Sequence, residues 1–350
     1  MTYLEAIVVG AFQGVTELFP VSSLGHSVLI PALVGGEWAR DLNVSAPESP
    51  YLAFIVGLHV ATAAALLLFF WRDWLRILGG LVSSIRYREM RTPAQRLAWL
   101  IIIATIPVGI AGLALDHLFR TTLGRPIPAA AFLMVNGVVL YVGERLRRRA
   151  EAGARADAVP DTAAGITASG AADPEATVVM AAVGWDPNRQ MIWPARDPDA
   201  AGHSAHEIEH YAEQAADAAS DSRLARLSIA RGTLIGSAQI LALLPGISRS
   251  GITMVAGLLR GLSHEDAARF SFLLATPVIL AAGVLKIPDL FGPMGAGIHG
   301  QVLAGSIAAF VAAYVAVRFL THYFRTRTLT PFAIYCALAG AGSLAWLTLG

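Results

Sequence analysis

The chain has 350 residues, of which 55% are hydrophobic and only 15% are charged, and its mean hydropathy is +0.57. Soluble domains carry about 25% charged residues, so this composition excludes an ordinary soluble protein. The formal net charge of +1 gives no indication of a polyanionic partner, and we expect no nucleic acid to bind. Because Cys336 is the only cysteine, a disulfide framework or a thiolate metal site within one chain is also excluded.

Apolar residues gather in eight blocks along the chain. The blocks cover residues 3–34, 51–71, 97–115, 127–142, 224–262, 270–285, 302–321 and 331–349. A transmembrane helix needs roughly 20 predominantly apolar residues, and six of the blocks fit single spans. The first and fifth blocks are longer and are interrupted by polar residues. We therefore predict an all-α polytopic membrane protein with about six transmembrane helices and two re-entrant helical hairpins. The N-terminus lacks a basic segment, so we expect no cleavable signal peptide.

The first interrupted block places polar side chains at membrane depth. These side chains are Gln13, Glu17, Ser22, Ser23 and His26. Ionisable groups inside a membrane are costly and usually functional. Pro20 and Gly25 break the helix at the same place, and broken backbone is tolerated there only where protein or a polar cavity satisfies it. The pattern predicts a buried polar site.

A polar stretch from Glu144 to Ser222 separates two halves of the chain. It is rich in Ala, Asp, Glu, Gly and Pro, and we expect a long cytoplasmic loop without stable structure. His203, His206 and His210 have a spacing compatible with a metal, although a solvated loop explains them better. The predicted organisation is a first repeat at 1–143, this loop at 144–222, and a second, inverted repeat at 223–350.

The second interrupted block echoes the first. Its polar and helix-breaking residues are Gln239, Pro245, Ser248, Arg249, Ser250, Gly251 and Thr253. Arg249 stands where the first copy has Leu24 or His26, and its guanidinium is a planar fork that matches phosphate oxygens. Backbone amides of the helix that follows Gly251 would add partial positive charge.

Basic residues in the short loops predict how the blocks cross the membrane, because Lys and Arg favour the cytoplasmic side. Arginines are frequent in 72–96, 145–149 and 325–327, whereas the 35–50 loop is acidic. The first four blocks then have the same topology as the last four, but inverted. The two interrupted blocks enter from opposite faces and can meet at the midplane, as in other inverted-repeat membrane proteins.

Together the two stretches indicate phosphoryl transfer. Gln13 and Glu17 share a helix face, so the amide can orient the carboxylate. Ser22, Ser23 and His26 are nucleophile or acid–base candidates. Arg249 would hold phosphate oxygens, and a divalent cation could bridge Glu17 and the phosphates.

The runs QGVTELFPVSSLGH, LLPGISRSG, FSFLLATPVILAAG and TLTPFAIY resemble the undecaprenyl-diphosphatase family, the bacitracin-resistance type of membrane lipid pyrophosphatase. The resemblance covers nearly the whole chain except 144–222. It implies hydrolysis of undecaprenyl diphosphate to undecaprenyl phosphate and inorganic phosphate, which recycles the lipid carrier for peptidoglycan synthesis. It also implies an inverted repeat with six spans in the bacterial inner membrane, an active site facing the outer side, and membrane lipid as a partner. The sequence leaves the oligomeric state open, with a homodimer as one alternative.

The resemblance also implies roles for single residues. The family's paired acidic motif falls on Gln13 and Glu17, with Glu17 as the acid–base or metal-associated carboxylate. The family's serine and histidine positions fall on Ser22, Ser23 and His26, and its phosphate-gripping motif on Ser248, Arg249, Ser250 and Thr253, next to Gly251. We expect Mg²⁺ or Ca²⁺ as cofactor and supporting roles for Gln13, Gln239 and His59. Because Gln13 is an amide, this chain departs from the two-carboxylate form of the motif.

Other interpretations stay open from the sequence alone. Glu17 could be a structural partner of Arg249, Ser22 and Ser23 could cap a helix, and His26 and His59 could pack in the core. Inverted repeats with broken helices are also transporter architecture, so the alternative function is a membrane transporter or prenyl-phosphate flippase.

Overall fold

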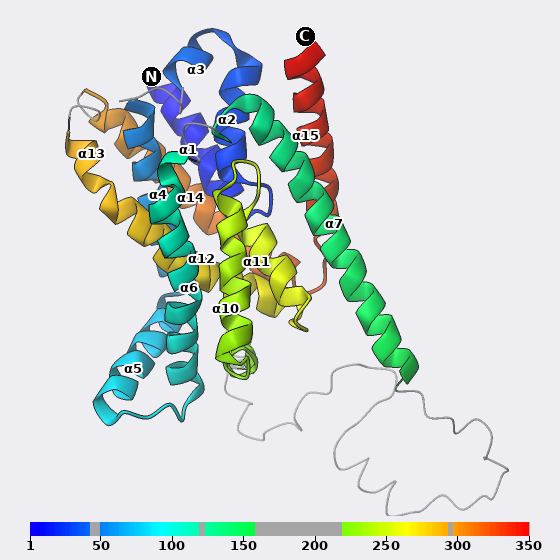
Figure 1. The fold of residues 1–350 in the computed structure, drawn as a ribbon. Helices are drawn as coiled ribbons and strands as arrows, with labels where there is room; N and C mark the ends of the chain where they lie inside the picture. Colours follow the sequence, from blue (N-terminus) through cyan, green and yellow to red (C-terminus); the bar gives the residue numbers. More distant parts are fainter. Residues whose placement is uncertain (43–49, 119–122, 158–218, 293–296, 350) are drawn as a thin grey trace, which may run out of the picture. The chain divides into compact units, whose positions relative to one another are not determined.

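The computed structural model describes residues 1–42, 50–118, 123–157, 219–292 and 297–349, and every regular element in these ranges is a helix (Figure 1). The N-terminal half contains α1 (Tyr3–Leu18), α2 (Ser23–Val34), α3 (Gly36–Asp41), α4 (Pro50–Phe69), α5 (Trp71–Tyr87), α6 (Pro93–Leu118) and α7 (Pro126–Asp157). The C-terminal half contains α10 (Ile229–Ser237), the 3₁₀ helix η4 (Ala238–Leu243), α11 (Arg249–Leu258), α12 (His264–Leu285), α13 (Ile287–Phe291), α14 (His299–Tyr323) and α15 (Thr330–Leu349).

Five of the described helices are long and apolar enough to cross a membrane: α6, α7, α12, α14 and α15. The bent pair α4 and α5 would supply a sixth span if it crosses as one unit. The predicted all-α polytopic class is therefore confirmed. The inverted repeat, the re-entrant placement of the two broken blocks and the repeat boundaries stay predictions.

The chain forms two compact units, one made of 1–149 with 221–350 and the other of 150–220. Most of the predicted loop, including His203, His206 and His210, lies outside the described residues. Helix α7 continues to Asp157, well past the predicted end of its apolar block at residue 142. The extension is rich in Arg, Ala and Glu, which are strong helix formers that a hydropathy criterion overlooks.

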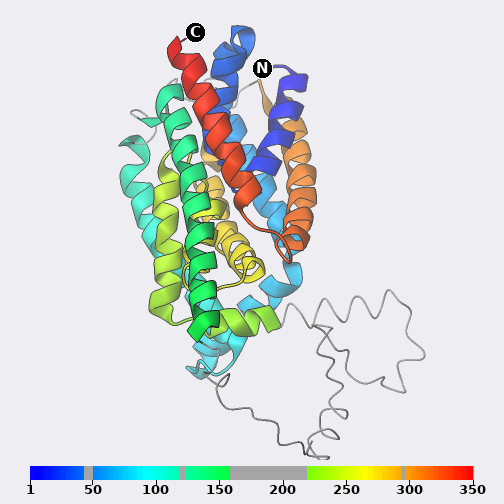
Figure 2. The ribbon, with the colours of Figure 1, turned by 90° about the vertical axis from the view of Figure 1, so that its right-hand side faces the viewer.

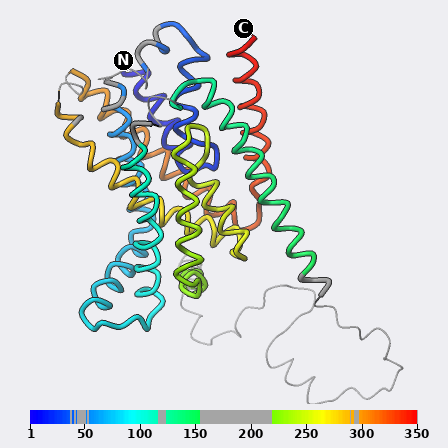
Figure 3. The backbone as a smooth tube through the Cα atoms, in the orientation of Figure 1, coloured from blue at the N-terminus to red at the C-terminus, as the bar shows by residue number. Residues whose placement is uncertain are grey.

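The segment after the second apolar block is a helix and not the loop that its arginines suggested. Helices α4 and α5 meet at Phe70 with a bend of 84°. Figure 3 shows the chain leaving α5 through a short turn and re-entering the bundle as α6, against which α5 packs. Arginines alternate with Trp71, Leu75 and Leu78 along α5, so the helix is amphipathic, as helices at a membrane interface are.

Small residues bring the long helices into backbone contact. A Cβ added at Gly10 or Gly14 of α1 would lie 2.2–2.3 Å from the carbonyl oxygens of Gly305 and Ala309 in α14. Gly137 of α7 and Gly340 of α15 are equally close to the facing backbones, and Figure 2 shows α15 crossing against the upper part of α7. Such close approach is how membrane helices associate when the surrounding lipid is as apolar as their side chains.

Candidate active site

The first break in the helices places Glu17 and Ser23 at the ends of adjoining elements. Helix α1 ends at Leu18, and α2 begins at Ser23. Ser22 between them is the N-cap of α2: its Oγ accepts a hydrogen bond from Gly25 N at 3.2 Å. Its backbone lies at φ 69°, ψ 99°, an unfavourable region for a residue other than glycine. Ser22 is thus a cap held in a strained turn.

The second break repeats this arrangement with different residues. Ser248 is the N-cap of α11, and its Oγ accepts from Gly251 N at 3.2 Å. Here the left-handed residue is Gly246, at φ 113°, where glycine is the natural choice. Arg249 follows the cap directly, as Ser23 follows Ser22. The caps therefore align Arg249 with Ser23, whereas the sequence comparison placed it opposite Leu24 or His26.

The two breaks are in direct contact. Gly246 N donates to Ser22 Oγ at 3.2 Å, and Ser250 Oγ donates to the carbonyl oxygen of Phe19 at 3.1 Å. A Cβ on Gly25 would lie 2.8 Å from the Cα of Gly246, so the approach leaves no room for a side chain there. Polar groups freed by each break thus find partners on the other, which is what a membrane interior requires.

Asn136, on α7, joins the two breaks, and the sequence analysis missed it. Its Nδ2 donates to the carbonyl oxygen of Pro20 at 3.1 Å, and its Oδ1 accepts from Ser248 N at 3.0 Å. The side chain is fully buried. Its position in the middle of an apolar block could have identified it from the sequence, because polar residues inside membranes usually have a functional role.

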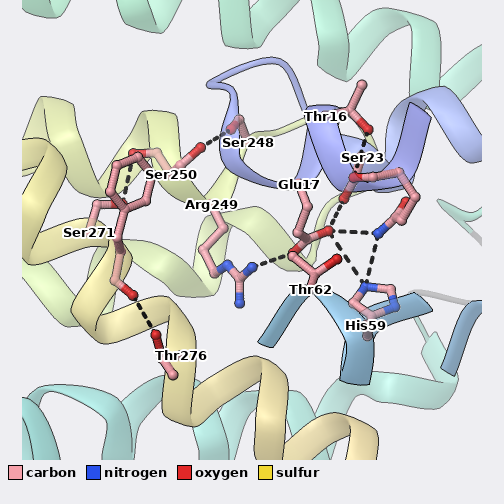
Figure 4. Close-up of polar contacts among 12 residues, drawn as sticks. Thr16, Glu17, Ser23, His59, Thr62, Ser248, Arg249, Ser250, Ser271 and Thr276 are labelled. Atoms are coloured by element: carbon pink, nitrogen blue, oxygen red, sulfur yellow. Dashed lines mark hydrogen bonds and ion pairs between the residues drawn. The ribbon is translucent and has the colours of Figure 1, made fainter. Parts of the chain in front are cut away.

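Glu17 is the centre of the polar cluster (Figure 4). Its Oε1 pairs with Arg249 Nη2, and its Oε2 accepts from Ser23 Oγ at 2.5 Å and from Gln13 Nε2 at 2.9 Å. His59 Nε2 lies 3.6 Å from the same Oε2. Figure 4 shows Arg249 approaching the carboxylate from one side, with Ser23 and His59 on the other. One residue from each break and one from α4 therefore converge on a single carboxylate.

Both ring nitrogens of His59 have neighbours in the site. Nδ1 lies 2.8 Å from the carbonyl oxygen of Ile55, which can only accept, so Nδ1 carries the proton. Nε2 faces Glu17 Oε2 and lies 3.5 Å from Gln13 Nε2. The His59 side chain keeps 30% of its surface exposed. The predicted supporting residue is thus a direct member of the cluster.

His26 lies apart from the carboxylate. Its Nδ1 is 2.7 Å from the carbonyl oxygen of Ser22, and its Nε2 is 2.8 Å from the hydroxyl of Tyr335. Both ring nitrogens are therefore occupied, and Tyr335 was not among the predicted residues. His26 and Gln13 line a small pocket of about 70 Å³ with apolar walls that include Phe12 and Trp38.

The remaining predicted residues lie away from the carboxylate, and most of them hydrogen-bond within the second break. Thr253 Oγ1 donates to the carbonyl oxygen of Arg249 at 2.7 Å, and Ser250 Oγ shares a 3.0 Å hydrogen bond with Ser248 Oγ. Gly251 supplies the amide that Ser248 accepts. Gln239 is 1% exposed, and neither end of its amide has a partner among the described residues. Among the described contacts, no side chain of Thr253, Ser250, Ser248 or Gln239 reaches Glu17.

Arg249 has several N–H donors that make no hydrogen bond within the described residues. Within the described residues only its Nη2 has a recorded hydrogen-bond partner, which is Glu17, although a guanidinium carries five N–H groups. The Arg249 side chain is 16% exposed and that of Glu17 is 6% exposed. Breaking such a buried ion pair from one side typically costs about 3–5 kcal/mol, because the remaining charge is left uncompensated. The ion pair therefore connects the two breaks, and Arg249 keeps N–H groups that can bind a further acceptor.

The donor set can take part in holding a divalent cation but cannot enclose one. The described residues contain no group of three or more His, Cys, Asp and Glu side chains placed to hold a metal. Glu17 and His59 are two such side chains in contact, with Gln13 beside them. Mg²⁺ is commonly held by one or two carboxylates together with substrate phosphates. The residues fit a cation whose coordination the substrate completes.

Comparison with known proteins assigns the chain to a family. Residues 6–170 and 206–342 match the family described as Bacitracin resistance protein BacA. The match extends further into 144–222 than we expected. An undecaprenyl-diphosphatase of Mycolicibacterium paratuberculosis is 65% identical over 349 residues, covering 100% of this chain and 98% of the relative.

More distant relatives carry the same name. Undecaprenyl-diphosphatase 1 of Frankia casuarinae is 55% identical over 97% of this chain and 96% of its own. The undecaprenyl-diphosphatase of Granulibacter bethesdensis is 37% identical over 99% of this chain and 97% of its own. The chain that joins Ser23 and Arg249 through Glu17 therefore belongs to the bacitracin resistance protein BacA family.

Proposed function

We propose that the cluster around Glu17 is where this chain, an undecaprenyl-diphosphatase by its family and its relatives, hydrolyses undecaprenyl diphosphate to undecaprenyl phosphate and inorganic phosphate. The observation that carries the proposal is the convergence of Ser23 and Arg249 on Glu17. A hydroxyl bonded to a carboxylate, beside a guanidinium with free donors, is the set of groups that phosphoryl transfer requires.

Ser23 is the nucleophile in this proposal. Of the three candidates, Ser22 Oγ accepts from two backbone amides, and His26 has both nitrogens occupied. Only Ser23 Oγ contacts a carboxylate, at 2.5 Å, the arrangement of a nucleophile and its general base.

The reaction then has two balanced steps. Ser23 Oγ forms a bond to the terminal phosphorus while the bond to the bridging oxygen breaks, and undecaprenyl phosphate leaves. Glu17 takes the Ser23 proton and passes it to the departing phosphate. Water next attacks the phosphoserine, and Glu17 moves a proton from that water to Ser23 Oγ as inorganic phosphate departs.

Arg249 acts on the charge of the diphosphate in this proposal. The unused N–H groups of Arg249 bind phosphate oxygens, and a fixed charge in a site of low polarity stabilises the transferred group strongly. Glu17 would help to hold a divalent cation, which would neutralise further charge on the phosphates. We place the site on the outer side of the bacterial inner membrane, following the arginine distribution of the loops.

The test is release of inorganic phosphate from undecaprenyl diphosphate by the purified protein in detergent. We expect release by the wild type, loss with a chelator that divalent cation restores, and about a 10³-fold lower turnover in Arg249→Ala. Thermal unfolding of the variant checks that it is folded. Undiminished turnover in folded Arg249→Ala would disprove the site assignment.

The rival function is translocation of a prenyl phosphate across the membrane. The relatives' name and the Ser23–Glu17 contact favour the enzyme, because anion transport needs no nucleophile. A folded protein that releases no phosphate in several lipids, but moves labelled lipid between vesicle leaflets, would favour transport instead.

A further inference from the structure

A cavity between α5, α6 and α10 shares no lining residue with the cluster around Glu17. Its volume is about 290 Å³, and its lining residues are Ser84, Arg88, Glu89, Met90, Trp99, Ile103 and Ile229. Met90 is 53% exposed and Ile229 is 44% exposed, so the cavity opens at the surface of the helical bundle. The cavity is therefore a place for a ligand that is distinct from the proposed active site.

The apolar wall of this cavity continues along the exposed side of α6. Trp99 and Ile103 line the cavity. Ile106 and Ile110 follow at the three- and four-residue spacing that keeps side chains on one helix face, and they are 50% and 64% exposed. Because α6 is long and apolar enough to cross a membrane, this exposed stripe faces acyl chains. An acyl chain that lies along α6 can therefore enter the cavity.

Arg88 gives the cavity a positive rim. Its side chain is exposed and has no recorded partner among the described residues. Glu89, the acidic residue of the lining, is paired with Arg91 at 2.9 Å. The stretch 86–96 contains four arginines and this one acidic residue. The cavity thus combines apolar walls with an uncompensated guanidinium, a combination that suits an amphipathic anion.

The backbone at Arg88 adopts a conformation that favours glycine. Arg88 is the C-cap of α5 at φ 55° and ψ 36°, and Ser22 is the other non-glycine residue at positive φ in the described part of the chain. Gln95 fixes the turn that follows, because its Oε1 accepts from Arg91 N at 2.8 Å and from Thr92 N at 3.0 Å. An arginine at a position where glycine is usual indicates a role for its side chain.

We propose that the cavity beside Arg88 binds an anionic phospholipid. The Arg88 guanidinium pairs with the phosphate of the headgroup, while one acyl chain lies against Trp99 and Ile103 and continues along α6. Basic residues next to a membrane span attract anionic lipids, and tryptophan is common at the depth of the headgroups. Free inorganic phosphate would use the guanidinium but not the apolar walls.

The test is quenching of tryptophan fluorescence by brominated phospholipids in vesicles that contain the full chain. Subtracting the emission of Trp99→Phe from that of the wild type isolates the signal of Trp99. We expect brominated phosphatidylglycerol to quench this signal at about a fivefold lower mole fraction than brominated phosphatidylcholine, which is the preference that one interfacial arginine provides.

Arg88→Gly removes the guanidinium and also relieves the backbone strain, so the variant does not depend on a weakened cap. It should lose the preference for phosphatidylglycerol and unfold at the same or a higher temperature than the wild type. Arg318→Gln is the matched control, because Arg318 is exposed on α14 and does not line the cavity, and it should keep the preference.

Three results would overturn the inference. The first is equal quenching of Trp99 by the two lipids in the wild type, and the second is a preference that survives in Arg88→Gly. The third is a Trp99 signal that neither lipid quenches, as expected if a second copy of the chain covers the cavity.

Discussion

The two breaks share one backbone design but contribute different chemistry. In each, a serine caps the following helix by accepting a hydrogen bond from the amide three residues on, at 3.2 Å. The residue after the cap then reaches Glu17. That residue is Ser23 in the first break and Arg249 in the second. The first break thus provides a nucleophile and the second a permanent charge.

The difference extends to the turn before each cap. The second break relieves its left-handed turn with Gly246, whereas the first break places Ser22 at φ 69°. Ser22 Oγ accepts from Gly246 N as well as Gly25 N, so the hydroxyl that glycine would lack binds the two breaks together. Strain in the first break is therefore offset by contacts that position both residues after the caps.

Ser23→Ala tests the nucleophile half of this comparison and should have the largest effect. Removing the hydroxyl that Glu17 activates should lower turnover by about 10³-fold or more with little change in stability. Phosphate release and trapping of a labelled phosphoserine measure it. Ser27→Ala, one turn further along α2, is the control and should remain active. Near-normal turnover in Ser23→Ala would shift the nucleophile to water.

Arg249→Lys tests the other side of the comparison, the permanent charge that the second break provides. A lysine keeps the charge but cannot pair with Glu17 and still present a planar fork to phosphate oxygens. We expect turnover to fall by about 10²-fold, less than in Arg249→Ala, as measured by phosphate release at saturating substrate. Equal activity of lysine and arginine at this position would show that a point charge is sufficient.

Asn136→Ala tests the connection between the breaks. The change leaves the amide of Ser248 without its buried partner and the carbonyl of Pro20 with only a weak contact to Cys336 Sγ, and an unsatisfied buried group typically costs about 1–3 kcal/mol. Thermal unfolding in detergent should register this loss, and turnover should fall by about tenfold as the two breaks separate. Cys336→Ala removes only weak sulfur contacts to the same groups and should have a smaller effect.

The sequence predicted site residues where polar side chains interrupt an apolar, membrane-spanning block. Glu17, Ser23 and Arg249 stand out inside apolar blocks, and the structure brings these three together. The helical spans follow from hydropathy alone, because lipid leaves few alternatives to a helix. Hydropathy also explains why the amphipathic helix α5 was missed. Its arginines lower the mean hydropathy by which spans are identified.

Other features depend on tertiary contacts that no local pattern encodes. The pairing of His26 with Tyr335 joins residues 309 positions apart, and Asn136 bridges segments on either side of it in the sequence. The alignment of Arg249 with Ser23 also required the caps, because the second break has one residue more between its proline and its serine. Asn136 of α7 and Tyr335 of α15 complete the site, and only the fold reveals these two residues.

A double-mutant cycle on Glu17→Gln and Arg249→Ala tests most directly whether the two breaks form one catalytic unit. Each single variant should lose about 10³-fold in turnover, and the double variant should lose little more than the worse single, because residues that act together are not additive. Removing both charges also avoids leaving one of them buried alone. Multiplication of the two losses toward about 10⁶-fold, or normal phosphate release by either folded single variant, would contradict the account.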